Sequence, residues 1–290
     1  IQVDPWMSAS AKRADMILAP SMCLEREDIN NVSDAFTEEA YAHYTEAMVP
    51  PPGDTMDEYE MLWWLAKHMG IEMNFPGGPV SMETCPDKAT VLDLISEGSL
   101  LKPSKAKADA AALDRKGAAI TYDELHPVVG PADPEATEKF DLNAGAMPSE
   151  LIDYAANDPV IDGFDFRLIS RRSKHRYNSN GHTFPKLVEK MPTNPAFFNP
   201  GDLAAAGIQD GAIIEITSTT ASIFGLAKAD DKVRPGVISM SHAFGDSEAG
   251  KDEVMSKGGS TNRLLSDANN IDPITGQALQ SAIPVRVSAA

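Results

Sequence analysis

A short polar segment holds most of the side chains in this sequence that could bind an anionic, nucleotide-like ligand. It follows an apolar run and contains these residues: Ser170, Arg171, Arg172, Ser173, Lys174, His175, Arg176, Tyr177, Asn178 and Ser179. Guanidinium groups bind diphosphate oxygens in a forked geometry, and hydroxyl and amide groups bind sugars and heterocycle edges. The segment therefore predicts either a ligand loop of that kind or a solvated basic turn.

His242 and Asn262 are two further polar residues in positions where a ligand could contact them. His242 follows the apolar run 237–240, so it could donate to a ligand oxygen at a strand end or be a hydrogen-bonded core histidine. Asn262 has both donors and an acceptor, so it could bind a heterocycle edge or cap the helical turn that follows. The residues alone leave these alternatives open.

The overall composition excludes several classes of protein. The net charge of −18, from 43 acidic and 25 basic residues, disfavours a phosphate backbone, so we expect no nucleic-acid partner. No run approaches the roughly 18 apolar residues of a membrane span. Cys23 and Cys85 form no CxxC pair and no iron–sulfur spacing, and we expect both to be buried thiols. Dinucleotide, P-loop and nucleophile-elbow motifs are absent from the sequence.

The N-terminal half carries the signals of an α/β region. The apolar run 14–20 ends at a proline, as a buried strand would. Apolar residues recur at helical spacing over 57–69, and Gly70 provides a stop. Further helices are expected over 90–97, capped by Thr90, and over 105–116. A domain boundary is predicted near residue 157.

The C-terminal half carries the signals of a small β-barrel. Its strands are expected over residues 166–169, 213–217, 222–229, 237–240 and 285–287. One short helix at 199–207 has an Asn cap, a Pro at its first position and a Gly at its exit. Several short strands with one embedded helix are typical of a barrel.

Several short motifs follow one another along the chain. They are Ala14-Asp15 before an apolar triplet and Pro20, Pro51-Pro52-Gly53, Leu168–Arg172 with His175 and Asn178-Ser179, Asn199–Gly211, Arg234–Ile238, His242–Gly245, Thr261–Leu265 and Asp272–Gly276. Their order and spacing resemble the molybdopterin oxidoreductase family, which includes dimethyl sulfoxide reductases, formate dehydrogenases and nitrate reductases. The resemblance covers about two thirds of the chain and is weakest over residues 76–150.

The resemblance implies a fold, a cofactor and a set of binding residues. The fold would be a partial Rossmann-like α/β region at residues 1–157, followed by a double-psi β-barrel at residues 158–290. The cofactor would be bis-molybdopterin guanine dinucleotide with molybdenum or tungsten. Its ligands in this chain would be Ser170, Arg171, Arg172, His175, Ser179, His242 and Asn262. No catalytic residue and no metal ligand is expected within the chain.

The same resemblance implies that the chain works as part of a larger oxidoreductase. The reaction would be oxygen-atom transfer or two-electron dehydrogenation of a small-molecule substrate. The expected partners are the remainder of the catalytic subunit, which would hold the metal ligand and any iron–sulfur cluster, and an iron–sulfur electron-transfer subunit. Two alternatives stay open, namely a separately encoded cofactor-binding subunit and a non-enzymatic barrel that binds other proteins.

Overall fold

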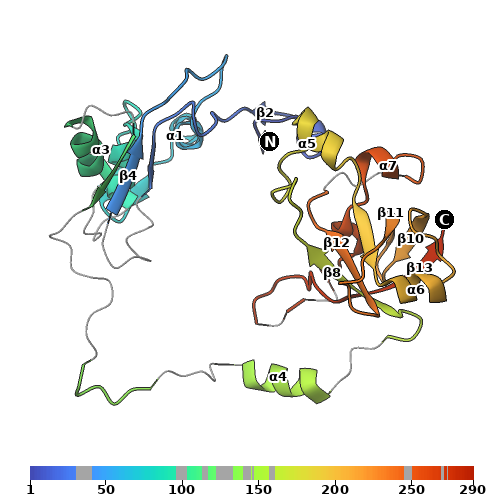
Figure 1. The fold of residues 1–290 in the computed structure, drawn as a ribbon. Coiled ribbons are helices and arrows are strands. Elements are labelled where there is room, and N and C mark those ends of the chain that lie inside the picture. The colour runs from blue at the N-terminus through green and yellow to red at the C-terminus, as the bar shows by residue number, and fades with distance from the viewer. Residues whose placement is uncertain are drawn as a thin grey trace. The chain divides into compact units, whose positions relative to one another are not determined.

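The computed structural model separates the chain into two compact units, Ile1–Glu138 and Lys139–Ala290 (Figure 1). The residues described are 1–30, 41–95, 103–112, 117–121, 133–139, 145, 147–156, 161–244, 250–268, 271–272 and 274–290. The domain limit predicted between residues 157 and 158 lies outside them and stays a prediction. Among the described residues, no helix combines the length and apolar character that crossing a bilayer requires.

In the residues described, the N-terminal unit combines small sheets with three α-helices and the 3-10 helix η1 (Ala11–Arg13). Its α-helices are α1 (Glu58–Met69), α2 (Lys88–Ile95) and α3 (Pro103–Ala112). Strands β3 (Asp28–Asn30), β4 (Tyr41–Thr45) and β7 (Gly117–Thr121) form an antiparallel sheet. Two smaller pairs are the parallel β1 (Gln2–Val3) with β2 (Ile17–Leu18) and the antiparallel β5 (Asn74–Phe75) with β6 (Gly78–Pro79).

Helix α1 is the predicted amphipathic helix, and both of its ends have local causes. Asp57 and Glu60 form a capping box at its start, and Gly70 ends it in a left-handed conformation with φ 68°. Trp63 is buried, and its indole N–H donates to the Ser81 carbonyl over 2.7 Å. The expected Thr90 cap of α2 is wrong, because that helix begins earlier and an upstream carboxylate accepts from the Thr90 N–H.

The C-terminal unit contains a closed six-stranded barrel, as the strand pattern predicted. Its strands follow the order β10-β11-β9-β12-β8-β13 around the barrel (Figure 1). They are β8 (Phe166–Arg171), β9 (Pro195–Phe198), β10 (Ile213–Thr217), β11 (Ser222–Ala229), β12 (Val237–Ser241) and β13 (Ile283–Ala289). The pairs β8–β12 and β9–β11 are parallel, and the other pairs are antiparallel. Strand β9 was not predicted.

The C-terminal unit also contains short helices. They are α4 (Met147–Ala156), α5 (Pro185–Lys190), α6 (Pro200–Ala205) and α7 (Val254–Lys257), together with the 3-10 helix η3 (Thr261–Leu264). Asn199 caps α6 as predicted, since its side chain accepts from the Gly201 N–H over 2.9 Å. Asp202 and Asp210 have structural roles. Their carboxylates accept backbone N–H groups of Gly236 and Ala229, each over 2.8 Å.

The barrel encloses one apolar core. Aliphatic and aromatic side chains from all six strands fill it, and these are among the fully buried members: Leu168, Ala196, Phe198, Ile214, Ile216, Ala227, Ile238, Met240 and Val285. Phe198 packs edge-on against Phe166, with ring centroids 5.7 Å apart. This packed core fixes the strand ends from which the polar loops emerge.

Candidate cofactor-binding site

The parallel strands β8 and β12 end side by side, and residues near their ends line two different cavities. In the strand register Ser170 pairs with Met240 and Arg171 with Ser241. Side chains alternate across a strand, so neighbouring residues face opposite sides. Ser170 accordingly lines a small cavity together with His242, whereas Arg171 and Ser241 line a larger cleft.

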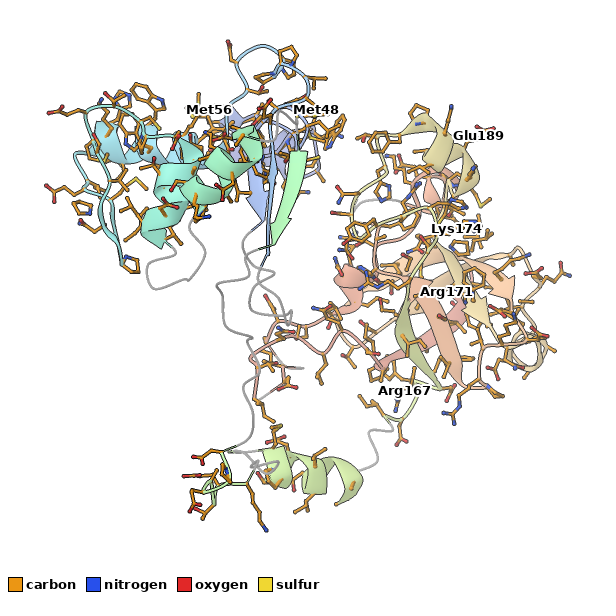
Figure 2. The ribbon with its side chains drawn as sticks, turned by 60° about the vertical axis from the view of Figure 1, so that its left-hand side comes forward. Met48, Met56, Arg167, Arg171, Lys174 and Glu189 are labelled. Atoms are coloured by element: carbon orange, nitrogen blue, oxygen red, sulfur yellow. The ribbon has the colours of Figure 1, made fainter. Side chains whose placement is uncertain are left out.

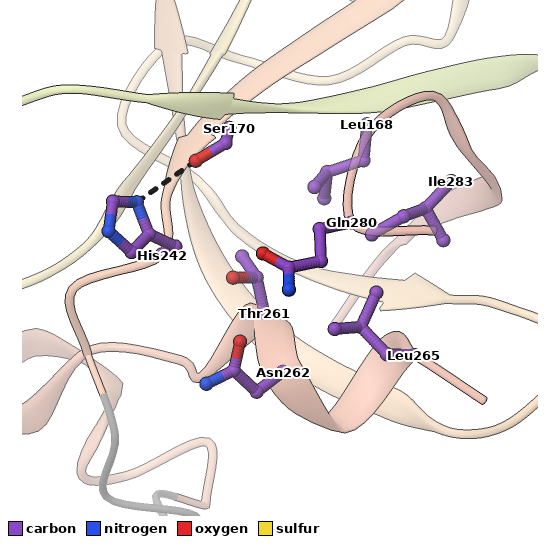
Figure 3. A pocket seen from close by; sticks show the side chains of 8 residues that line it. All are labelled: Leu168, Ser170, His242, Thr261, Asn262, Leu265, Gln280 and Ile283. Carbon is purple, nitrogen blue, oxygen red and sulfur yellow. Dashed lines mark hydrogen bonds between the residues drawn. The ribbon is translucent and has the colours of Figure 1, made fainter. Parts of the chain in front are cut away.

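The small cavity has a volume of about 20 Å³, which is room for one water-sized group. It is lined by Leu168, Ser170, His242, Thr261, Asn262, Leu265, Gln280 and Ile283 (Figure 3). Ser170 Oγ lies 3.0 Å from His242 Nδ1. Asn262 lies inside η3, whose cap position is Ser260, so it does not cap that turn.

The larger cleft has a volume of about 370 Å³ and a cationic lining. It is lined by Arg171, Arg172, Ser173, Lys174, His175, Lys190, Met191, Asn194, Pro195, Phe197 and Ser241. Figure 2 shows Arg167, Arg171 and Lys174 in order along β8 and the loop that follows it. Four permanent cations around one cleft create a local positive potential on an otherwise acidic chain.

A chain of hydrogen bonds joins the cleft to the small cavity. Arg172 Nη1 donates to Asn178 Oδ1 over 2.8 Å, and His242 Nε2 lies 3.0 Å from the same oxygen. His242 then contacts Ser170 through its other ring nitrogen. Three of the predicted ligand residues therefore belong to one network, which Asn178 completes.

The two neighbouring arginines at the end of β8 have different environments. Arg171 Nη2 forms an ion pair with Asp230 Oδ2 at 2.9 Å, and its guanidinium lies 3.8 Å from the centre of the Phe197 ring. The backbone N–H of Lys232, followed by Arg171, lowers the pKa of the Asp230 carboxyl. Arg171 is thus fixed and partly neutralised, while Arg172 is exposed at the cleft.

Arg176 was counted with the basic loop, but the structure gives it a different role. Its side chain is 7% exposed and donates to the backbone carbonyls of His175, Gly181 and Met191. Burial lowers the pKa of this guanidinium. Arg176 holds the loop in shape from beneath, so that its neighbours can face the cleft.

The seven predicted ligand residues are distributed unevenly. Ser170, His242 and Asn262 line the small cavity, and Arg171, Arg172 and His175 line the cleft. Ser179 is exposed in the turn of the loop and lines neither of these two cavities. The assignment of all seven as cofactor ligands stays a prediction.

Asn194 is the main residue at this site that the sequence did not reveal. It is 0% exposed, and its amide nitrogen donates to the carbonyls of Ser241 (2.8 Å) and Gly259 (2.9 Å). Its Oδ1 accepts the Ser241 N–H over 3.2 Å. Asn194 therefore ties the end of β12 to the segment that leads into η3, and no local sequence pattern announces such a tertiary contact.

The donor set around the cleft fits a pterin dinucleotide. The buried hydroxyl of Ser173 has no hydrogen-bond partner within the described part of the protein, and Ser173 lines the cleft. A buried hydroxyl without a partner is costly, so it is suited to a polar ligand group. Cationic side chains beside it suit the diphosphate.

Among the described residues, no group of three or more His, Cys, Asp or Glu side chains is arranged to hold a metal ion. Cys85 is partly buried, but Cys23 is exposed, so the expectation of two buried thiols is wrong for Cys23. Cys23 lies in a turn downstream of β2 and is open to solvent there. Neither cysteine is part of a metal-binding cluster in the described regions.

Comparison with known proteins places the barrel in a family. Residues 166–283 match the family described as "Molydopterin dinucleotide binding domain". The chain is 24% identical over 257 residues to the trimethylamine-N-oxide reductase of Haemophilus influenzae, covering 80% of this chain and 30% of that protein. It is 33% identical over 142 residues to the molybdopterin-containing subunit of the arsenate respiratory reductase of Shewanella sp., covering 43% of this chain and 16% of that subunit.

A solved structure shares the fold. The acetylene hydratase of Pelobacter acetylenicus superposes with a TM-score of 0.65 and 18% identity, covering 99% of this chain and 40% of that protein. The chain spans about 30% of the length of the curated relatives it matches. The barrel at residues 166–283 therefore matches a molybdopterin dinucleotide-binding domain, and the chain is similar to reductases that include a molybdopterin-containing subunit.

Proposed function

We propose that this chain is the cofactor-holding C-terminal part of a molybdenum oxidoreductase that performs oxygen-atom transfer or two-electron dehydrogenation on a small molecule. The observation that carries the proposal is the junction of β8 and β12, where a cationic cleft and a polar cavity are linked through Arg172, Asn178 and His242. When bound, the cofactor supplies the two-electron chemistry of its metal centre. The residues of this chain bind and orient it.

The two cavities suit different parts of the dinucleotide. Arg172, Lys174 and Lys190 in the cleft are suited to the diphosphate, and Ser173 supplies a hydroxyl beside them. Asn262 and the Ser170–His242 pair are suited to the polar edge of a heterocycle. His175 adds a ring at the cleft, and Ser179 lies in the turn of the same loop.

The finer description of the fold belongs to the same proposal. A closed barrel with two parallel strand pairs supports a double-psi topology for the C-terminal unit. The N-terminal unit would be part of a Rossmann-like α/β region, supported by its parallel β1–β2 pair. The proposed partners are the remainder of the catalytic subunit and an iron–sulfur electron-transfer subunit.

Cofactor content tests the proposal directly. The complete enzyme and its Arg172→Ala variant are purified, and the guanine nucleotide and molybdenum released per chain are measured. Loss of a charged hydrogen-bond donor costs about 1.5–3 kcal/mol, so the affinity is expected to fall roughly 10- to 100-fold. Arg172→Lys keeps the charge but not the fork and is expected to give an intermediate occupancy.

Lys228→Ala is the matched control, because Lys228 is paired with Asp210 at 3.0 Å and lines neither cavity. It is expected to keep full occupancy. Full occupancy of Arg172→Ala would remove Arg172 from the site. A wild-type enzyme without any pterin nucleotide would overturn the proposed function itself.

A further inference from the structure

Asn178 occupies an unusual backbone position at the centre of the network. Its φ is +50°, in the left-handed region that asparagine tolerates better than most residues with a Cβ. The side-chain oxygen lies within hydrogen-bond distance of both Arg172 and His242. The turn conformation therefore aims one amide oxygen at two donors that come from different strand ends.

Hydrogen-bond chemistry fixes the direction of each bond in this network. A guanidinium can only donate, so the Asn178 atom that faces Arg172 must be the amide oxygen. An amide oxygen can only accept, so His242 Nε2 must carry a hydrogen to bond to it. In a neutral imidazole the other nitrogen, Nδ1, is then an acceptor, and Ser170 must donate its hydroxyl hydrogen to it.

The hydroxyl of Ser170 is therefore polarised in one direction. Its single hydrogen is used on His242, so its oxygen offers only lone pairs to the small cavity. At about 20 Å³, the cavity has room for one water-sized group. A lone N–H or NH₂ group on a heterocycle edge fits both the size and the polarity.

We infer that Asn178 is a positioning residue which, through the tautomer of His242, makes Ser170 an acceptor for an N–H edge of the cofactor. The inference rests on the proposed function, since it names the part of the same cofactor that this cavity receives. Guanine and pterin both present such an edge, whereas the diphosphate does not. Arg172 remains oriented toward the cleft by the same amide oxygen.

Nitrogen NMR of the histidine rings tests the inference without any activity measurement. The 290-residue chain is labelled with ¹⁵N-histidine, and His242→Gln identifies the His242 signals among the six histidines. In alkaline buffer, where imidazole is neutral, Nε2 is expected to resonate as a protonated nitrogen and Nδ1 as an unprotonated one. The opposite tautomer, or an equal mixture, in the wild-type chain would overturn the inference.

Three variants separate the hydrogen bond from the backbone conformation. Asn178→Gly keeps the left-handed turn but lacks the acceptor, and it is expected to yield a mixture of His242 tautomers. Asn178→Asp keeps both the turn and an acceptor, and it is expected to retain the wild-type tautomer. A wild-type tautomer in Asn178→Gly would show that other groups determine the tautomer of His242, and Asn178 would then have no positioning role. Ser170→Ala is expected to leave Nε2 protonated.

Small probes test which part of the ligand the cavity receives. Guanosine monophosphate and free pterin are added separately to the labelled chain, with inorganic diphosphate as the contrast. A shift of the His242 Nδ1 signal with one heterocycle supports the inference and identifies the source of the edge. A shift with diphosphate alone, or none with either heterocycle, would overturn it. The wild-type tautomer is measured without cofactor. The result therefore tests the role of Asn178 separately from the proposed function, which the pterin content of the enzyme tests.

Discussion

Different interactions stabilise each of the two units of this protein. The barrel encloses a continuous apolar core inside a closed sheet. The N-terminal unit has a smaller buried cluster, made of Ile29, Tyr44, Ala89 and Ala110. Around it lies a network of ion pairs that includes Arg26 with Glu58 and with Asp57 (3.3 Å), Lys88 with Asp57 (3.1 Å), and Lys107 with Glu27 (2.8 Å).

This difference suits the tasks of the two units. Apolar packing does not depend on charge state, so the barrel presents its loops in one geometry whatever ions bind nearby. Ion pairs depend on the protonation and solvation of both partners, and each pair is worth less than an apolar contact of similar size. The proposed anion site therefore lies on the unit whose stability depends less on ion pairs.

The strongest test of the comparison is a cavity in the barrel core. Phe198→Ala is expected to destabilise the barrel by about 3–5 kcal/mol, because Phe198 is 1% exposed and packs against Phe166. Hydrogen exchange of barrel peptides in increasing urea measures this change. Trp6, Trp63 and Trp64 all lie in the N-terminal unit, so tryptophan fluorescence reports on that unit alone.

Leu279→Ala is the control for that cavity, because Leu279 is 49% exposed, and it is expected to change the stability by no more than about 0.5 kcal/mol. The urea concentration at which tryptophan fluorescence reports unfolding of the N-terminal unit is expected to be unchanged in both variants. An equal shift of the tryptophan transition in Phe198→Ala would show that the two units unfold as one, and the comparison would fail.

The next largest effect is expected at the buried amide of the barrel. Asn194→Ala removes three hydrogen bonds that tie Ser241 to Gly259, at about 1 kcal/mol each, so a loss of about 2–3 kcal/mol is expected. Exchange should rise first in the peptides that contain Ser241 and Gly259. Asn194→Asp keeps the acceptor but loses the donors. Its loss of stability should therefore be smaller than that of Asn194→Ala. An equal rise in hydrogen exchange across the whole barrel would show that Asn194 does not act locally on Ser241 and Gly259.

A smaller effect is expected when the ion-pair network of the N-terminal unit is broken. Among the described residues, Lys88→Met leaves Asp57 with Arg26 as its ion-pair partner. Both side chains of the lost pair are largely buried, so a cost of about 1–2 kcal/mol is expected. Urea unfolding followed by tryptophan fluorescence measures it. Lys105→Met is the control, since the Lys105–Asp109 pair is exposed and is worth at most about 0.5 kcal/mol. Equal costs would show that burial of the network contributes nothing.

The smallest effect is a difference in alkaline sensitivity between the units. Burial, followed by the nearby Glu27, raises the pKa of Tyr44 from 10.0 to about 12, and burial also raises the pKa of Tyr59. A raised pKa in the folded state stabilises the unit below pH 10, and this contribution is lost as the pH rises through 12. Tryptophan fluorescence should therefore show the N-terminal unit weakening over this range, and less so in Tyr44→Phe. An unchanged pH response in that variant would exclude Tyr44 as the cause.

Local patterns predicted much of the fold and part of the site. Strand alternation and capping residues located α1, α6 and most barrel strands, because those signals lie within a few residues of one another. Strand β9 was missed because its Pro-Ala-Phe-Phe run is short and begins with a proline. The basic loop was identified from its composition, and its role in ligand binding stays a prediction. The roles of Asn178 and Asn194 could not be predicted, since each depends on at least one partner 47 or more residues away.

The alternation of side chains at the end of β8 limits how this site can change. Because Ser170 and Arg171 face different cavities, removing one residue from β8 would turn every following side chain to the other side. The Arg171 guanidinium would then take the place of the Ser170 hydroxyl in the small cavity, which suits a small neutral group. The length of this strand is thus as important as the identity of its residues, and ligand preference can be adjusted by substitution but not by insertion or deletion.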